Sequence, residues 1–182
     1  MVIAKGKLLA VAIRLTERAP MQEMFATGLT REAGVGSDFR GKPGPRQVTV
    51  LTRDGWEAAC SEIGTQLPWT TRRANLFIEG MDLKGTLGYE LSVGEAVLRI
   101  SGETGPCSRM EEGSPGLMSA LKPHWRGGVT AYVTRAGCVT VGCDVVLSRY
   151  LASQVSVVIY DRLRCAAKRG KALAGRYASE RL

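Results

Sequence analysis

Short β-branched segments separated by glycines limit what this chain can fold into. The sequence has 22 glycines among 182 residues, and glycine allows the backbone conformations that tight turns need. The segments between them favour strands because they are rich in valine, isoleucine and threonine. They cover residues 6–15, 22–29, 46–52, 75–79, 95–101, 127–135 and 138–147. The pattern predicts a mainly β fold, and we expect a closed or nearly closed β-barrel.

A few peripheral helices are expected beside the strands. Residues 54–64 have an apolar face formed by Trp56, Ala59, Cys60 and Ile63, and Asp54 is positioned to begin this helix. Residues 108–122 indicate two helical pieces, the second capped by Ser114. Residues 33–46 hold glycines, prolines and charges, which predicts a loop. Ala136-Gly137 indicates a hairpin between the last two strands.

The basic charge is concentrated at the C-terminus and divides the chain into two parts. The net charge is +8, and residues 161–182 alone contribute +5 from seven basic and two acidic residues. We expect a barrel domain over residues 1–149 and a basic helical extension over 150–182. Basic helices bind phosphate backbones and anionic lipids. Apolar residues at helical spacing instead favour a helix that docks on the barrel with its charges in water. Nucleic-acid binding is therefore not expected. A contact of this extension within a homodimer stays open as an alternative. These apolar residues are Val155, Val158, Ile159 and Leu163.

The apolar stretches are too short for a membrane span, which needs roughly 18 residues. Lys5 and Lys7 precede six apolar residues that end at Arg14, which fits a first strand better than an export signal. We therefore expect a cytoplasmic protein whose five cysteines are reduced. The cysteine spacing contains no CxxC pair and predicts no structural zinc site.

Cys107 is the strongest candidate for a reactive residue. It follows Gly105-Pro106 and stands at the entrance of an expected helix, where the helix dipole and the neighbouring Arg109 favour a thiolate. A thiolate binds soft metals and accepts sulfur. Free cysteines are also common as small buried apolar residues. The residues alone leave these two interpretations open.

A series of motifs between residues 34 and 144 extends this interpretation, within a resemblance to a known family that runs from about residue 6 to residue 147. In chain order they are Gly34-Val35-Gly36-Ser37-Asp38, Arg46-Gln47-Val48-Thr49, Asn75-Leu76 with Glu79-Gly80, Gly105-Pro106-Cys107-Ser108, Gly116-Leu117, Arg126-Gly127-Gly128, and Val141-Gly142 with Cys143 before Asp144. Their order resembles the MOSC domain, the C-terminal domain of molybdenum cofactor sulfurases, which also exists as stand-alone bacterial proteins. Two departures are Ser37, where the family usually has glycine, and Phe39-Arg40, where a histidine often follows the aspartate.

The resemblance implies a β-barrel that works with molybdenum cofactor (molybdopterin) or in sulfur transfer. By position, Cys107 would be the molybdenum ligand and a catalytic residue. The expected cofactor-binding residues are Asp38, Arg40, Arg46, Asn75 and Arg126. Arginine forks match phosphate oxygens, and Lys42, Arg72 and Arg73 are further candidates. A turn-forming role for Asp38 or Asn75 and a solvated position for each arginine remain the alternatives.

His124 is the single histidine and the candidate proton donor for a reductive step, although a plain surface or packing position is the alternative. The sequence has no G-x-S-x-G, no flavin or nicotinamide motif and no Walker-type loop. Electrons would therefore come from a partner protein.

Two classes of function follow from these observations. The first is a molybdenum-dependent oxidoreductase that reduces small N-hydroxylated compounds with Cys107 at the metal. The second is a module without its own catalysis, which carries persulfide sulfur on Cys107 from a sulfur donor to an acceptor, or holds the cofactor. Some family members are fused to pyridoxal-phosphate-dependent sulfurase domains, and here such a domain would be a separate partner.

Overall fold

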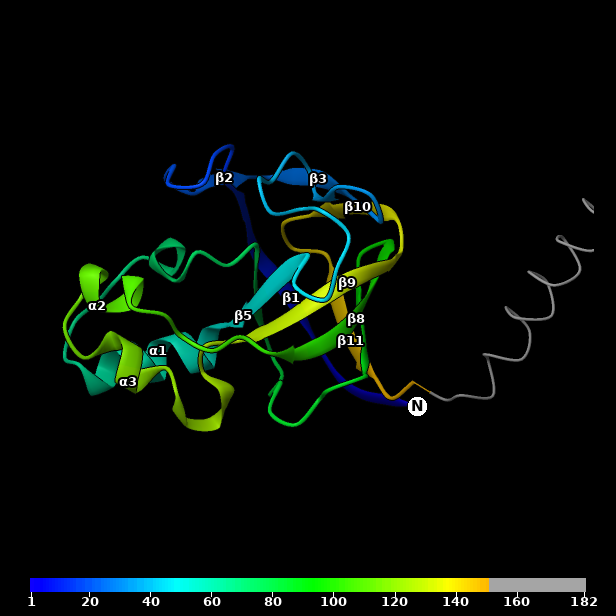
Figure 1. Ribbon diagram of the computed structural model, residues 1–182. Helices are drawn as coiled ribbons and strands as arrows, with labels where there is room; N and C mark the ends of the chain where they lie inside the picture. Colours follow the sequence, from blue (N-terminus) through cyan, green and yellow to red (C-terminus); the bar gives the residue numbers. More distant parts are fainter. Residues whose placement is uncertain (151–182) are drawn as a thin grey trace, which may run out of the picture. The chain divides into compact units, whose positions relative to one another are not determined.

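Seven strands form a closed barrel in the computed structural model, which describes residues 1–150 (Figure 1). The ring runs through β11 (Asp144–Ser148), β7 (Glu90–Val93), β8 (Ala96–Glu103), β9 (Val129–Arg135), β5 (Val48–Thr52), β6 (Leu76–Glu79) and β1 (Val2–Ile13). Pairing of β1 with β11 closes the ring. Neighbours are antiparallel except β5 and β6, which are parallel. The predicted mainly β barrel is confirmed.

The long strand β1 connects three parts of the structure. Its first half pairs with β11, its middle with β6, and its end with β2 (Gln22–Met24). The register to β6 shifts between Leu8 and Ala10, so the strand bends as it passes along the barrel. This bend carries the end of β1, and with it Arg14, to the helical end of the barrel.

A small separate sheet corrects the predicted hairpin. The sheet has the order β10 (Gly137–Thr140), β3 (Ala26–Thr30) and β4 (Gly34–Val35). β10 pairs with β3 and not with β9, so the hairpin at Ala136-Gly137 is wrong. The expected strand 138–147 is divided by a turn in which the Cys143 amide donates to the Thr140 carbonyl at 2.9 Å. The turn sends the chain from the small sheet back into the barrel.

The helices gather at one end of the barrel, beyond β5 (Figure 1). They are α1 (Arg53–Glu62), α2 (Arg109–Gly113) and α3 (Leu117–Ala120), with 3-10 turns η1 (Trp69–Arg72) and η2 (Pro123–Trp125). Thr52 caps α1, two residues earlier than the expected Asp54. The Glu111 carboxylate accepts the Gly116 and Met118 amides at 2.9 Å, and so takes the capping place expected for Ser114.

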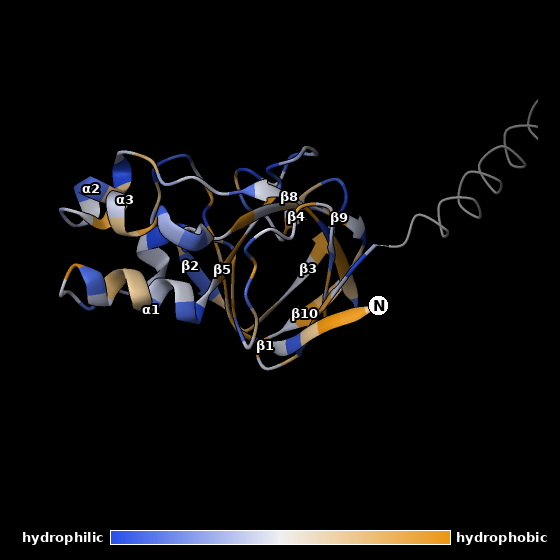
Figure 2. Cartoon of the chain, turned by 90° about the horizontal axis from the view of Figure 1, so that it is seen from below, coloured by the Kyte–Doolittle hydropathy of each residue, from blue (hydrophilic) through white to orange (hydrophobic). Residues whose placement is uncertain are grey.

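Alternate residues of the strands supply two cores. Val11 and Val50 point into the barrel, whereas their neighbours Ala12 and Leu51 pack with the helices, as the two-residue period of a strand requires. The helical core contains Trp56, Ala59 and Cys60, which confirms the predicted face of α1. Figure 2 shows both hydrophilic and more hydrophobic residues along α1. The helical end is therefore a second layer fixed to the outside of the barrel.

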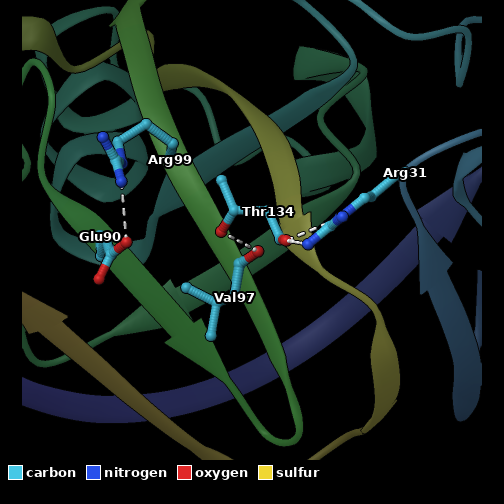
Figure 3. A network of polar contacts seen from close by, with 5 residues as sticks. All are labelled: Arg31, Glu90, Val97, Arg99 and Thr134. Carbon is cyan, nitrogen blue, oxygen red and sulfur yellow. Dashed lines mark hydrogen bonds and ion pairs between the residues drawn. The ribbon is translucent and has the colours of Figure 1, made fainter. Parts of the chain in front are cut away.

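Polar contacts tie the loop after β3 to the barrel (Figure 3). Arg31 donates from two guanidinium nitrogens to the Thr134 carbonyl on β9. The Thr134 hydroxyl donates to the Val97 carbonyl on β8 at 3.1 Å. Arg99 and Glu90 form an ion pair at 2.9 Å between β8 and β7. The barrel wall and the small sheet are thereby linked on this side.

The expected extension 150–182 lies outside the described residues apart from Tyr150, and so does the predicted basic helix. Among residues 1–150, no helix has the length and apolarity that crossing a membrane requires.

Gly128 is predicted to tolerate no side chain, because it lies directly before β9 and against the backbone of β5. Its φ is 88°, and a Cβ atom there would lie 2.1 Å from the Val50 carbonyl oxygen. Gly142 has a φ of 89° but has no atom within 4 Å of such a Cβ. We expect Gly128→Ala to lower the free energy of unfolding by about 2–4 kcal/mol, and Gly142→Ala by about 1 kcal/mol from backbone strain alone. Urea unfolding of both variants measures the difference, and equal losses would contradict the close packing.

Candidate functional site

A pocket of about 320 Å³ opens between the barrel and the helical end. It collects residues from the end of β1, the loop before β5, the η1 turn and the segment between β8 and α2. Five residues expected at the site line it: Asp38, Arg40, Arg46, Asn75 and Cys107. The fold therefore brings together side chains that are far apart in sequence.

Positive charge dominates this pocket. Six arginines line it, namely Arg14, Arg40, Arg46, Arg72, Arg73 and Arg109, against the single carboxylate of Asp38. Burial is the main cause that lowers the pKa values of Arg14, Arg72 and Arg73, and neighbouring arginines lower them further. Arginine nevertheless remains protonated at neutral pH because its ordinary pKa lies far above neutral. The pocket is therefore suited to an anionic ligand.

Arg72 is the most rigidly held of these arginines. Its side chain is buried, and its Nε and Nη2 atoms donate to the carbonyls of Gly127 and Thr104, each at 2.9 Å. A Cβ on Gly127 would lie 2.6 Å from the Thr104 carbonyl oxygen, so glycine is required beside this arrangement. Within residues 1–150 the Nη1 atom has no hydrogen-bond acceptor. One edge of the guanidinium is thus fixed, and the other is free to meet a ligand.

Cys107 is exposed at this pocket, so the alternative of a small buried residue is wrong. Its carbonyl accepts the Met110 amide at 2.9 Å, which begins the turn into α2. That helix has only five residues, so its dipole contributes less than predicted. A charged thiolate here acts on the pKa values of Arg72 and Arg73, raising both against the effect of burial. Arg72 and Arg73 therefore lie close enough to Cys107 to interact with it electrostatically.

Asp38 and Asn75 shape the pocket through hydrogen bonds to the backbone. The Asp38 carboxylate accepts the Arg14 amide at 3.0 Å and the Arg40 amide at 2.9 Å, which fastens the loop to the end of β1. Asn75 accepts the amide and hydroxyl of Thr49 and donates to the Ala12 carbonyl. It thereby ties β1, β5 and the start of β6 together. Asp38 thus has the turn-forming role that was its alternative, and Asn75 has a bridging one. Both residues also line the pocket, so their role in cofactor binding stays a prediction.

His124 and Arg126 lie in a different hollow, of about 290 Å³, beside the start of α1. The His124 Nδ1 atom is 3.2 Å from the Lys84 Nζ atom, and Arg126 pairs with Glu62. Positive φ values at His124 and Trp125 turn the chain in this direction. The structure does not bring either residue to Cys107. The Arg126 motif instead contributes through Gly127, whose carbonyl holds Arg72.

Sequence reasoning missed Arg14 and Thr104. Arg14 follows the last residue of β1 and lines the pocket, where its amide donates to Asp38. Thr104 is 5% exposed and lines the pocket, and its hydroxyl has no hydrogen-bond partner among residues 1–150. An unpaired buried hydroxyl costs free energy unless a ligand satisfies it. No sequence pattern marks such a residue.

Replacing Thr104 by valine tests that unpaired hydroxyl. We expect Thr104→Val to raise the free energy of unfolding of the ligand-free protein by about 1 kcal/mol, because a buried polar group without a partner is removed. Thr130 is the matched control, since it is 4% exposed but its hydroxyl bonds to Ser101 and Gly102. Thr130→Val should lower stability by about 1 kcal/mol. Chemical denaturation compares the two, and destabilisation by both would show that the Thr104 hydroxyl is satisfied.

Comparisons with known proteins agree with the sequence motifs. No curated protein matches the sequence. Among solved structures, YuaD from Bacillus subtilis is similar with a TM-score of 0.69 and 19% identity, covering 83% of this chain and all of that one. YiiM from Geobacillus stearothermophilus has a TM-score of 0.64 and 13% identity, covering 79% of this chain and 75% of that one. YiiM from Escherichia coli has a TM-score of 0.59 and 15% identity, covering 80% and 71%. The family model of the MOSC domain matches residues 36–146, more than half of the chain, and the chain therefore belongs to the MOSC domain family.

Proposed function

We propose that this protein binds molybdenum cofactor in the arginine-lined pocket, with the Cys107 thiolate as a ligand to the metal. The observation that carries the proposal is one exposed thiol in a pocket with six arginines. The donor set fits the cofactor, because a thiolate suits a soft metal and guanidinium groups suit a phosphate. Among residues 1–150 no cluster of three or more histidine, cysteine or acidic side chains could hold a metal ion. The metal would therefore depend on the cofactor's own sulfur atoms as well as on Cys107.

The arginines divide the work of holding an anion. Arg72 presents its free edge in a fixed orientation, because two of its nitrogens are bound to carbonyls. Arg40 and Arg46 are exposed, and their guanidinium groups have no acceptor within residues 1–150. They are free to close on a phosphate from the solvent side. The Thr104 hydroxyl is a further donor at the same pocket.

We propose reduction of small N-hydroxylated compounds as the activity. When bound, the cofactor supplies the two-electron redox chemistry for such a reaction. The chain itself contributes the thiolate of Cys107 and the positive field of the arginines, which favours anionic groups. Since His124 lines the other hollow, protons would enter from water. Electrons would come from a partner protein, in the cytoplasm, where Cys107 stays reduced.

A sulfur-carrier function is the second candidate, and the absence of histidine from the pocket lining favours it. An exposed thiol can take sulfur from a donor protein and pass it on without a proton donor of its own. A persulfide on Cys107 after incubation with a cysteine desulfurase, found in protein free of molybdenum, would support this function over the reductase.

The metal content of the purified protein tests the first function. Protein made in cells that synthesise the cofactor should contain close to one molybdenum per chain, and Cys107→Ala should lose most of it. Cys138→Ala is the matched control, because Cys138 is also exposed but does not line the pocket. Elemental analysis by mass spectrometry measures all three proteins. Equal molybdenum in the Cys107→Ala and unchanged proteins would rule out Cys107 as a necessary ligand.

A further inference from the structure

Another hollow, distinct from the one that His124 lines, adjoins the Cys107 pocket and has a different chemistry. Its volume is about 420 Å³. Its lining residues are Phe39, Arg40, Lys42, Pro43, Gly44, Pro45 and Arg46. Arg40 and Arg46 line both hollows, so the two spaces share a wall. We call the second one the Phe39 hollow.

The backbone around the Phe39 hollow is fixed at several points. The Phe39 amide donates to the Arg14 carbonyl at 2.8 Å. Buried Gln47 donates to the Gly41 carbonyl at 3.0 Å, and the Ser101 hydroxyl donates to the Pro45 carbonyl. Two prolines restrict the loop between these points. Because the loop is held in place, a ligand meets a largely pre-formed surface, and less conformational entropy of the loop is lost on binding.

The surface is apolar in the middle and cationic around it. Phe39 is 45% exposed, although a large aromatic residue usually buries more of its area. Two proline rings lie in the same hollow. The lining also has three cations and no carboxylate.

None of the three cationic groups has a hydrogen-bond acceptor or an ion-pair partner within the described part of the chain. The nearby Asp38 carboxylate already accepts two backbone amides. The positive charge of the Phe39 hollow is therefore left for a ligand.

We propose that the Phe39 hollow binds a planar aromatic anion, whose ring stacks on Phe39 while its negative group meets Lys42, Arg40 or Arg46. Offset stacking suits an exposed ring, and unpaired cations at the rim select for negative charge. A neutral aliphatic molecule would use neither feature. The role of the hollow in presenting substrate to Cys107 rests on the proposed function. Binding at the hollow does not rest on that function, because neither Phe39 nor the three cationic side chains need the metal in order to hold the ligand.

The test uses the full-length protein without cofactor and 2-naphthoate as the probe. Ligand-observed NMR titration gives its Kd, and 2-naphthamide serves as the neutral probe of the same shape. We expect Phe39→Ala to weaken 2-naphthoate binding about fivefold, which is the effect of losing one stacked ring. Phe25→Ala should leave the Kd unchanged, because Phe25 is 73% exposed but does not line the hollow.

Charge is tested separately with Lys42→Gln. This change should weaken 2-naphthoate about threefold and leave 2-naphthamide unchanged, and the difference should shrink at high salt. Lys122→Gln is the control, since Lys122 is exposed and does not line the Phe39 hollow.

Two results would overturn the proposal. One is the absence of 2-naphthoate binding, and the other is equal binding by Phe39→Ala and Phe25→Ala. Both can occur in a protein that holds molybdenum, so they would leave the proposed function standing. Conversely, stacking of 2-naphthoate on Phe39 in a protein that never takes up molybdenum would support the proposed binding site and rule out the reductase function.

Discussion

The buried guanidinium of Arg72 is the contact on which the site depends. It joins the η1 turn to the end of β8 and to the start of β9 through the carbonyls of Thr104 and Gly127. Removing a charge from water is costly unless hydrogen bonds compensate, and burial lowers the pKa of this group. The two carbonyls supply that compensation. They also fix the distance between the segment that leads to Cys107 and the turn that carries Arg73.

Two further pocket arginines are held by backbone carbonyls in the same way, whereas Arg40 and Arg46 have no acceptor within residues 1–150. Arg14 and Arg73 donate to the carbonyl of Glu17, and Arg73 donates to that of Ala19 as well. Arg109 approaches the Glu17 carboxylate at 3.8 Å. The segment between β1 and β2 therefore holds these positively charged guanidinium groups close together. Such an arrangement gains stability when an anion binds, because the mutual repulsion of the guanidinium groups is relieved.

The fold was largely predictable because the strand signal is local. Valine-rich and threonine-rich segments such as Val48–Thr52 became strands, and the apolar face of α1 became the helical core. Strand partners were not predictable in the same way, since β10 pairs with β3 across more than 100 residues of sequence. A glycine beside an alanine indicates a turn but does not say which strand follows it into the sheet.

The sequence predicted which residues form the candidate site better than it predicted how they are arranged in space. Asp38, Arg40, Arg46, Asn75 and Cys107 do meet in one pocket. His124 and Arg126 do not, because left-handed backbone at His124 and Trp125 sends the chain elsewhere, and no residue type marks that conformation in advance. Thr104 escaped notice for a related reason, since an unpaired hydroxyl is a property of its surroundings.

The central claim is that Cys107 and the arginines form one site for a cofactor-bound metal. X-ray absorption at the molybdenum edge tests it most directly, using protein purified with its metal and a Cys107→Ser variant loaded in the same way. The account predicts one fewer sulfur neighbour of molybdenum in the variant, with an oxygen in its place. An identical sulfur count in both proteins would contradict it and would leave the thiol free for another chemistry.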